Sequence, residues 1–355
     1  MIASRTLGST LGSPLAGILA RILARILAGA LGLCALAALS ACTPKPVPAT
    51  APKELTFTIL SAENQASMAP LWTPLLDDMS AQIGVKVKPF FATNYTSLIE
   101  AMRFKQAQVG WFSALPALEA VERADAEVLG RVIDAGGDAT YKSVIIVRKG
   151  SGVTLDKLMA CGQRYAFGLG DPQSTSGTLA PMAYLFTPNG VEPSKCFKTV
   201  RSASHQANAF SVANGVLDAA TNNSVGILFF QRENPKAAAR IETIWTSPPL
   251  PESSIVARKD LDPAIKEKMR QFFLTYGVGT GPTADRQRLV LKGLAYGGFK
   301  PADNAYLDPI REMRASQALA AAKAGKDPGK IAAAQAAFDK IHAVAAGKRA
   351  KEPDV

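Results

Sequence analysis

The chain has 355 residues, with 40 lysines and arginines against 29 acids and a formal net charge of +11. Before the C-terminal tail, the basic residues are scattered among acids rather than gathered in a stripe with aromatic side chains. This pattern argues against a nucleic-acid partner and favours small anions or an anionic membrane surface. The two histidines and four cysteines form no cluster at metal-ligand spacing, so we expect neither a metal nor a cofactor.

The N-terminus has the pattern of a bacterial lipoprotein signal. Arg5, Arg21 and Arg25 precede the apolar run 26–41, and Cys42 follows it directly. The run is shorter than the about 20 residues that a spanning helix needs. We therefore expect cleavage before Cys42 and lipidation of that cysteine, which would place the protein in the periplasm on a membrane anchor. The alternative is one transmembrane helix with a cysteine placed by chance.

From Glu54 onward, short strand-like runs alternate with helix-like segments, which is typical of parallel α/β units. Gly150, Ser151 and Gly152 follow a nearly continuous apolar strand, and we expect the chain to cross there into a second lobe. The segments before this point are strands over 55–60, 85–92, 107–112, 127–134 and 143–149, with helices over 70–84, 96–106 and 115–125.

The second lobe continues the alternation, and an apolar strand at 253–259 returns the chain to the first lobe after a proline-rich break. An alanine- and lysine-rich tail of strong helix formers ends the chain, and it would dimerise, touch lipid headgroups or dock loosely. The predicted domains are a signal peptide at 1–41, an extended tether at 42–53, a discontinuous lobe 1 at 54–149 and 252–310, lobe 2 at 150–251, and a helical tail at 311–355.

Cys161 and Cys196 are the two cysteines that remain after the signal peptide and the lipidation site. Each precedes an apolar run that we expect to be a strand, and neighbouring parallel strands would bring the two thiols together. In an oxidising compartment this arrangement favours a disulfide. Two free thiols are the alternative.

The segment 168–177, GLGDPQSTSG, is the most specific internal motif. It follows a predicted strand and opens a predicted helix, where free N–H groups and the helix dipole attract an anion. Its three consecutive hydroxyl residues, Ser174, Thr175 and Ser176, add side-chain donors. Phosphate, sulfate, carboxylate or phosphonate would fit such a site, and the alternative is an ordinary capped loop.

Tyr95, Tyr141 and His205 are further candidates, because each lies at the start of a helix or strand where it would donate a hydrogen bond to an anion. Packing tyrosines and a capping or surface histidine are the alternatives. Ser176 with His205 does not make a hydrolase pair, since the segment has no G-x-S-x-G elbow and no acid is placed to orient the histidine. We therefore expect a protein that is not an enzyme.

Four segments stand in the order and spacing of a known family: PFFATNYTSLIEAMRF, GDPQSTSGTLAP, SHQANAFSVANG and DAATNNS. Over roughly residues 54–314, the chain resembles the periplasmic phosphonate/phosphite-binding proteins of ABC importers (PhnD-type). The resemblance implies the type II periplasmic-binding-protein fold, with two α/β lobes, two crossing hinge strands and a ligand held in the cleft between them. It also implies that the phosphonyl oxygens are held by Tyr95, Tyr141, Ser174, Thr175, Ser176 and His205.

Family members that take 2-aminoethylphosphonate have two carboxylates for its ammonium group. This chain has Val225 and Ser253 at the matching positions, and Lys142 replaces an aromatic residue of some relatives. An unpaired buried ammonium costs several kcal/mol, so we expect a ligand other than 2-aminoethylphosphonate, such as phosphite, methylphosphonate, hypophosphite or phosphate. A shift of Glu252 by one position would restore one acid.

The sequence therefore predicts a lipid-anchored receptor that captures a phosphorus oxyanion and delivers it to an ABC permease with its ATPase subunit. Two alternatives stay open at this point. One is a binding protein for another small anion, such as a sulfonate or a carboxylate. The other is a ligand-sensing receptor for a membrane signalling protein.

Overall fold

A computed structural model describes residues 53–60, 62–63 and 65–349. The predicted signal peptide, Cys42 and all of the predicted tether except Lys53 lie outside these residues. Within them, no helix has the length and apolar character that are needed to cross a membrane.

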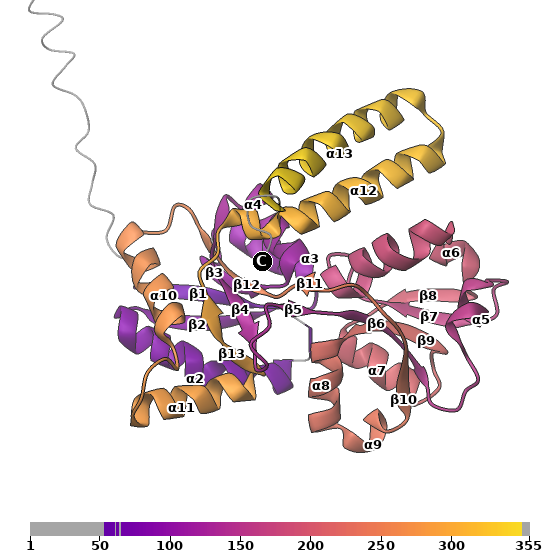
Figure 1. Ribbon diagram of the computed structural model, residues 1–355. Helices are drawn as coiled ribbons and strands as arrows, with labels where there is room; N and C mark the ends of the chain where they lie inside the picture. The colour runs from indigo at the N-terminus through magenta and orange to yellow at the C-terminus, as the bar shows by residue number, and fades with distance from the viewer. Residues whose placement is uncertain (1–52, 61, 64, 350–355) are drawn as a thin grey trace, which may run out of the picture. The chain divides into compact units, whose positions relative to one another are not determined.

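The first lobe is built on a six-stranded sheet with the order β13-β4-β12-β3-β1-β2. Strand β1 pairs in parallel with β2 and β3, whereas β12 runs antiparallel to β3 and β4. Figure 1 shows α2, α10 and α11 on one face of this sheet and α3 and α4 on the other. The strands are β1 (Glu54–Ile59), β2 (Lys86–Phe91), β3 (Val109–Phe112), β4 (Ala126–Asp134), β12 (Ser254–Arg258) and β13 (Tyr296–Lys300), and the helices are α2 (Gln65–Ile83), α3 (Tyr95–Arg103), α4 (Ala114–Arg123), α10 (Pro263–Thr275) and α11 (Pro282–Gly293).

The second lobe is built on a five-stranded sheet with the order β10-β6-β9-β7-β8. Strand β7 pairs in parallel with β8 and β9, and β6 runs antiparallel to β9 and β10. Its strands are β6 (Ser143–Arg148), β7 (Ala166–Leu169), β8 (Thr199–Ser202), β9 (Ala219–Asn223) and β10 (Ile241–Thr246). Its helical segments are α5 (Leu155–Met159), η1 (Thr175–Leu179), η2 (Met182–Phe186), η3 (Thr187–Asn189), α6 (Pro193–Cys196), α7 (His205–Ala213), α8 (Ser224–Glu233) and α9 (Pro235–Ala238).

The crossing between the lobes lies earlier in the chain than we expected. Strand β6, which we assigned to lobe 1, belongs to the second sheet, and residues 150–152 form only a turn after it. The chain instead crosses at β5 (Thr140–Tyr141) and β11 (Leu250–Pro251), two short strands that pair antiparallel with each other. An apolar run shows that a strand is buried on both faces, but it does not show to which of the two sheets the strand belongs. The expectation of parallel units is also only partly right, because both sheets are mixed.

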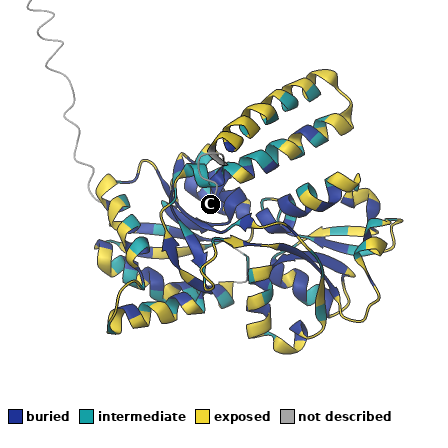
Figure 2. Cartoon of the chain, viewed as in Figure 1, coloured by how far each residue is buried: buried dark blue, intermediate teal, exposed yellow. Residues whose placement is uncertain are grey.

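Each lobe has its own aromatic core. In lobe 1, Trp72 packs against Phe57 and Trp111, with ring centroids 5.5 and 5.3 Å apart. In lobe 2, Phe167 stacks on Phe197 at 4.4 Å. Dark blue strands between yellow and teal helices in Figure 2 show that the sheets are the most buried layer of both lobes.

A disulfide joins Cys161 to Cys196, with the two Cα atoms 4.5 Å apart. The cysteines precede β7 and β8, which are neighbouring parallel strands. The bridge therefore closes the edge of the second sheet at the end where these two strands begin.

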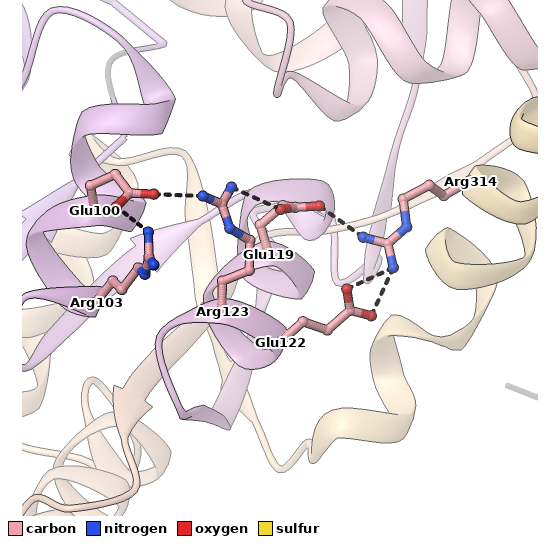
Figure 3. A network of polar contacts seen from close by, with 6 residues as sticks. All are labelled: Glu100, Arg103, Glu119, Glu122, Arg123 and Arg314. Carbon is pink, nitrogen blue, oxygen red and sulfur yellow. Dashed lines mark hydrogen bonds and ion pairs between the residues drawn. The ribbon is translucent and has the colours of Figure 1, made fainter.

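The tail forms a helical hairpin of α12 (Asp308–Gly325) and α13 (Pro328–Arg349). In the charged network of Figure 3, Arg314 of α12 pairs with Glu119 and Glu122 of α4, at 2.8 and 2.7 Å. One turn further along α12, the Gln317 side chain accepts a hydrogen bond of 2.9 Å from the Thr187 hydroxyl of lobe 2. Helix α12 thus contacts both lobes, whereas Figure 2 shows α13 mostly exposed.

Candidate ligand-binding site

A cavity of about 50 Å³ lies between the two lobes, enough for a few water molecules at about 10–15 Å³ each. Helices and helical turns from both lobes direct their N-termini toward it. These are α3, which begins at Tyr95, α4 with its N-cap Ser113, η1 with its N-cap Ser174, α7, which begins at His205, and α8 with its N-cap Asn223. Converging helix N-termini favour a negatively charged ligand.

Five of the six predicted ligand residues line this cavity: Tyr95, Tyr141, Ser174, Ser176 and His205. Asn223 also lines it, although sequence reasoning did not select it. The available signal was its place in the segment DAATNNS, one of the four that carry the family resemblance.

Thr175, the sixth predicted ligand residue, is fully buried and directs its hydroxyl to the first lobe. Its Oγ1 accepts a hydrogen bond from the N–H of Leu115 at 2.8 Å and donates one to Ser113 Oγ at 3.3 Å. The hydroxyl of Thr175 is therefore bound to the start of α4, and Thr175 is not among the described residues that line the cavity.

The turn that presents Ser174 and Ser176 depends on two glycines. The Ser174 hydroxyl accepts a hydrogen bond from the N–H of Gly177 at 2.9 Å and so caps η1. The Gly170 N–H donates to the Gly177 carbonyl at 2.9 Å. A Cβ on Gly177 would lie 2.7 Å from the Gly170 Cα, so neither position has room for a side chain. The close approach brings the strand end and the helix start together beneath the cavity.

The donors in the cavity are electrically neutral. Burial raises the pKa of Tyr95 and of Tyr141 well above the usual value, so both keep their protons. Burial lowers the pKa of His205, which is 3% exposed, to about 4. The Nδ1 atom of His205 has no hydrogen-bond partner within the described part of the chain, while Nε2 lies 3.5 Å from the Ser176 hydroxyl.

Two buried acids also line the cavity. The sequence analysis named Glu252 as a replacement for a missing ammonium-binding acid, whereas it did not select Glu63. Glu63 is 6% exposed, and burial together with the charge of Glu233 raises its pKa to about 8. Glu252 is 5% exposed, and burial raises its pKa as well. Its Oε1 accepts hydrogen bonds from the N–H and hydroxyl of Ser253 at 2.8 and 2.9 Å. Its Oε2 is buried with no partner among the described residues.

The remaining wall is apolar. Trp111 and Tyr296 face this part of the cavity with ring centroids 6.5 Å apart. Aliphatic and aromatic side chains complete it: Leu60, Met68, Val225, Phe229 and Leu294. The cavity lining therefore combines neutral polar donors, apolar side chains and two buried acids.

Comparison with known proteins identifies the family. Residues 57–307 match the family of periplasmic substrate-binding proteins of phosphonate ABC transporters. The chain is 38% identical over 275 residues to the phosphonates-binding periplasmic protein of Escherichia coli, covering 77% of this chain and 80% of that one. It is 27% identical over 217 residues to a probable phosphite-binding ABC transporter protein of Prochlorococcus marinus, covering 59% and 72%.

Solved structures agree with this result. A binding protein component of an ABC phosphonate transporter from Pseudomonas aeruginosa superposes with a TM-score of 0.79 at 34% identity, covering 83% of this chain and 99% of that one. A methylphosphonate complex from Prochlorococcus marinus has the same fold, with a TM-score of 0.65 at 23% identity over 74% and 97% of the two chains. The chain belongs to the periplasmic phosphonate-binding proteins of ABC transporters, which have the type II periplasmic-binding-protein fold.

Proposed function

We propose that the lobes enclose the phosphorus-oxygen group of a small phosphonate or phosphite, held by hydrogen bonds from Tyr95, Tyr141, Ser174, Ser176 and His205. The observation that carries this proposal is the convergence of helix N-termini on one small cavity. The bound ligand is then delivered to the permease and ATPase of the transporter.

Neutral donors suit reversible capture of an oxyanion. The described residues that line the cavity include no lysine or arginine. A buried cation would carry its own desolvation cost of several kcal/mol, which its attraction to the ligand would first have to offset. Hydroxyl, imidazole and peptide N–H donors replace the water around the anion, and hydrogen bonds to charged groups are the stronger ones.

Glu63 and Glu252 favour a second candidate, a phosphonate that carries an ammonium group. We expected such a ligand to be rejected because Val225 and Ser253 stand where relatives have acids. Val225 and Ser253 do line the cavity, but the two glutamates line it as well. A buried carboxyl group with a raised pKa is stabilised either by a proton or by a nearby cation. An ammonium group would then replace the protons of the two acids.

Calorimetric titration distinguishes the two candidates. The ligands are phosphite, methylphosphonate, phosphate and 2-aminoethylphosphonate, each titrated in two buffers with different ionisation enthalpies so that released protons are counted. Tight binding of phosphite or methylphosphonate with no signal from the amine supports the first candidate. Tight binding of the amine, with proton release that Glu252→Gln reduces, supports the second. Silence from all four ligands overturns both and points to a sulfonate or carboxylate receptor.

We also propose that Cys42 carries the lipid that holds the mature protein at the membrane. The support is the sequence pattern that ends at this cysteine. In cells fed a labelled fatty acid, the wild-type protein is expected to take up the label and partition into detergent, and Cys42→Ser to do neither. Equal labelling of both proteins would refute the assignment.

A further inference from the structure

The segment that presents Ser174 and Ser176 to the cavity also completes two helices of the other lobe. The Asp171 Oδ2 accepts a hydrogen bond of 3.1 Å from the N–H of Tyr95, the first residue of α3. The Thr175 Oγ1 accepts one of 2.8 Å from the N–H of Leu115, in the first turn of α4. The first N–H groups of a helix have no partner within the helix, so lobe 2 supplies these partners across the cleft.

Among its described residues, the first lobe offers these N–H groups no hydrogen-bond acceptor of its own. In α3, the Asn94 side chain caps the N–H of Ser97 rather than that of Tyr95. In α4, the N-cap Ser113 makes no side-chain capping bond to its own helix. The two peptide groups are therefore paired with protein only while the lobes are in contact.

Asp171 is held firmly in place for this contact. Its Oδ1 accepts a hydrogen bond from the N–H of Gln173 at 2.8 Å. Its carbonyl oxygen accepts from the N–H of Ser174 and the hydroxyl of Thr178, both at 2.8 Å. A carboxylate fixed at a helix N-terminus also interacts favourably with the helix dipole. Asp171 is thus oriented by lobe 2 before it meets lobe 1.

We propose that Asp171 and Thr175 are positioning residues that latch the closed cleft. The inference rests on the proposed ligand site, because Ser174 and Ser176 of the same short segment line the cavity. Ligand contacts and latch contacts alternate along one turn. A ligand that orders this turn therefore also sets the two latch groups against α3 and α4, and loss of the latch lets the cleft reopen and the ligand escape.

The test compares three variants of the mature protein with the wild type. Thr175→Val keeps the side-chain shape but removes the acceptor, Thr175→Ser keeps the hydroxyl, and Asp171→Asn keeps an acceptor but removes the charge. Amide hydrogen exchange of the first turns of α3 and α4 is measured without ligand and again at a saturating concentration of a ligand that binds. Dissociation rates are measured in parallel with methylphosphonate and with 2-aminoethylphosphonate.

Thr175→Val is expected to speed exchange of the Leu115 amide while leaving the buried strand amides of both sheets protected. It is also expected to raise the dissociation rate of a binding ligand about tenfold, which corresponds to about 1.4 kcal/mol, with little change in the association rate. Thr175→Ser restores the slow exchange and slow release. Asp171→Asn speeds exchange of the Tyr95 amide instead.

Unchanged exchange at Leu115 in Thr175→Val overturns the latch, and so does a rise in exchange throughout the protein, which indicates general destabilisation. Ser176→Ala separates this proposal from the proposed ligand site. If Ser176→Ala binds ligand as the wild type does while Thr175→Val still exposes the Leu115 amide, the ligand site fails and the latch stands. If neither ligand binds, the exchange data alone decide the latch.

Discussion

The wild-type protein is predicted to lose stability strongly as the pH rises to neutral and alkaline values, and substitution of Glu63 by glutamine is predicted to remove most of this loss. The Glu63 carboxyl is buried, and its pKa rises from 4.5 to about 8, mainly through burial and further through the charge of Glu233. In the unfolded chain it ionises near pH 4.5. Because the folded pKa is raised, its stabilising contribution is complete below pH 4.5 and is lost as the pH rises to about 8.

The magnitude follows from the width of this window. Each pH unit between the two pKa values costs about 1.4 kcal/mol of folding free energy. The pH window from 4.5 to about 8 therefore corresponds to a loss of up to about 5 kcal/mol. Glu63→Gln keeps the size of the side chain and abolishes its titration. The free energy of unfolding of this variant is expected to fall much less over the same pH range. Because both proteins retain Glu252, its contribution cancels when the two pH profiles are subtracted, and the difference reports on Glu63.

Urea unfolding of the wild type and Glu63→Gln at half-unit steps from pH 4.5 to 8.5 measures this difference. Glu233→Gln is the matched control. It removes the nearby charge but leaves the burial that is the larger cause, so most of the wild-type pH dependence is expected to remain. Parallel pH profiles for wild type and Glu63→Gln would show that the carboxyl of Glu63 is solvated rather than buried against the cavity.

Three further outcomes are expected. Burial lowers the pKa of His205 from 6.5 to about 4, so the wild type should lose about 3 kcal/mol of folding free energy as the pH falls through that range, because the unfolded chain binds the proton more readily. Melting curves of His205→Gln should lack this loss of stability at acid pH. Tyr141→Phe should weaken phosphonate binding about 10- to 100-fold in calorimetry, since it removes a hydrogen bond to a charged group, and an unchanged Kd would contradict its role. Reduction of the Cys161–Cys196 bridge, which closes a loop of 35 residues, should cost about 4 kcal/mol, seen as a lower melting temperature.

Local sequence patterns predicted most of the secondary structure, but they did not predict the hinge. The hinge depends on the pairing of β5 with β11, which are far apart in the sequence. The strand at 143–149 was recognised from its apolar residues, but its sheet was not, because β6 finds its partners at β9 and β10 far along the chain. The true crossing consists of two strands of two residues each. A pair this short carries no periodicity that distinguishes it from a loop.

The candidate site shows the same division between local and distant information. Ser174 and Ser176 could be found because a strand, a glycine turn and a helix start are adjacent in the sequence. Glu63 could not, since an acid in a loop is ordinarily solvated, and Glu252 was named only as a replacement, shifted by one position, for an acid missing at Ser253. The direction of the Thr175 hydroxyl likewise depends on α4, which is 60 residues away along the chain.

The position of Tyr141 within the hinge has a mechanical consequence for ligand capture. Tyr141 lies in β5 and pairs with Leu250 of β11, the strand by which the chain returns. Points on a rotation axis are displaced least when two bodies swing apart, so its ring keeps its place while Ser174 and Ser176 travel with their lobe. In the ligand site that we propose, the contact with Tyr141 would therefore change least in length as the cleft opens and closes.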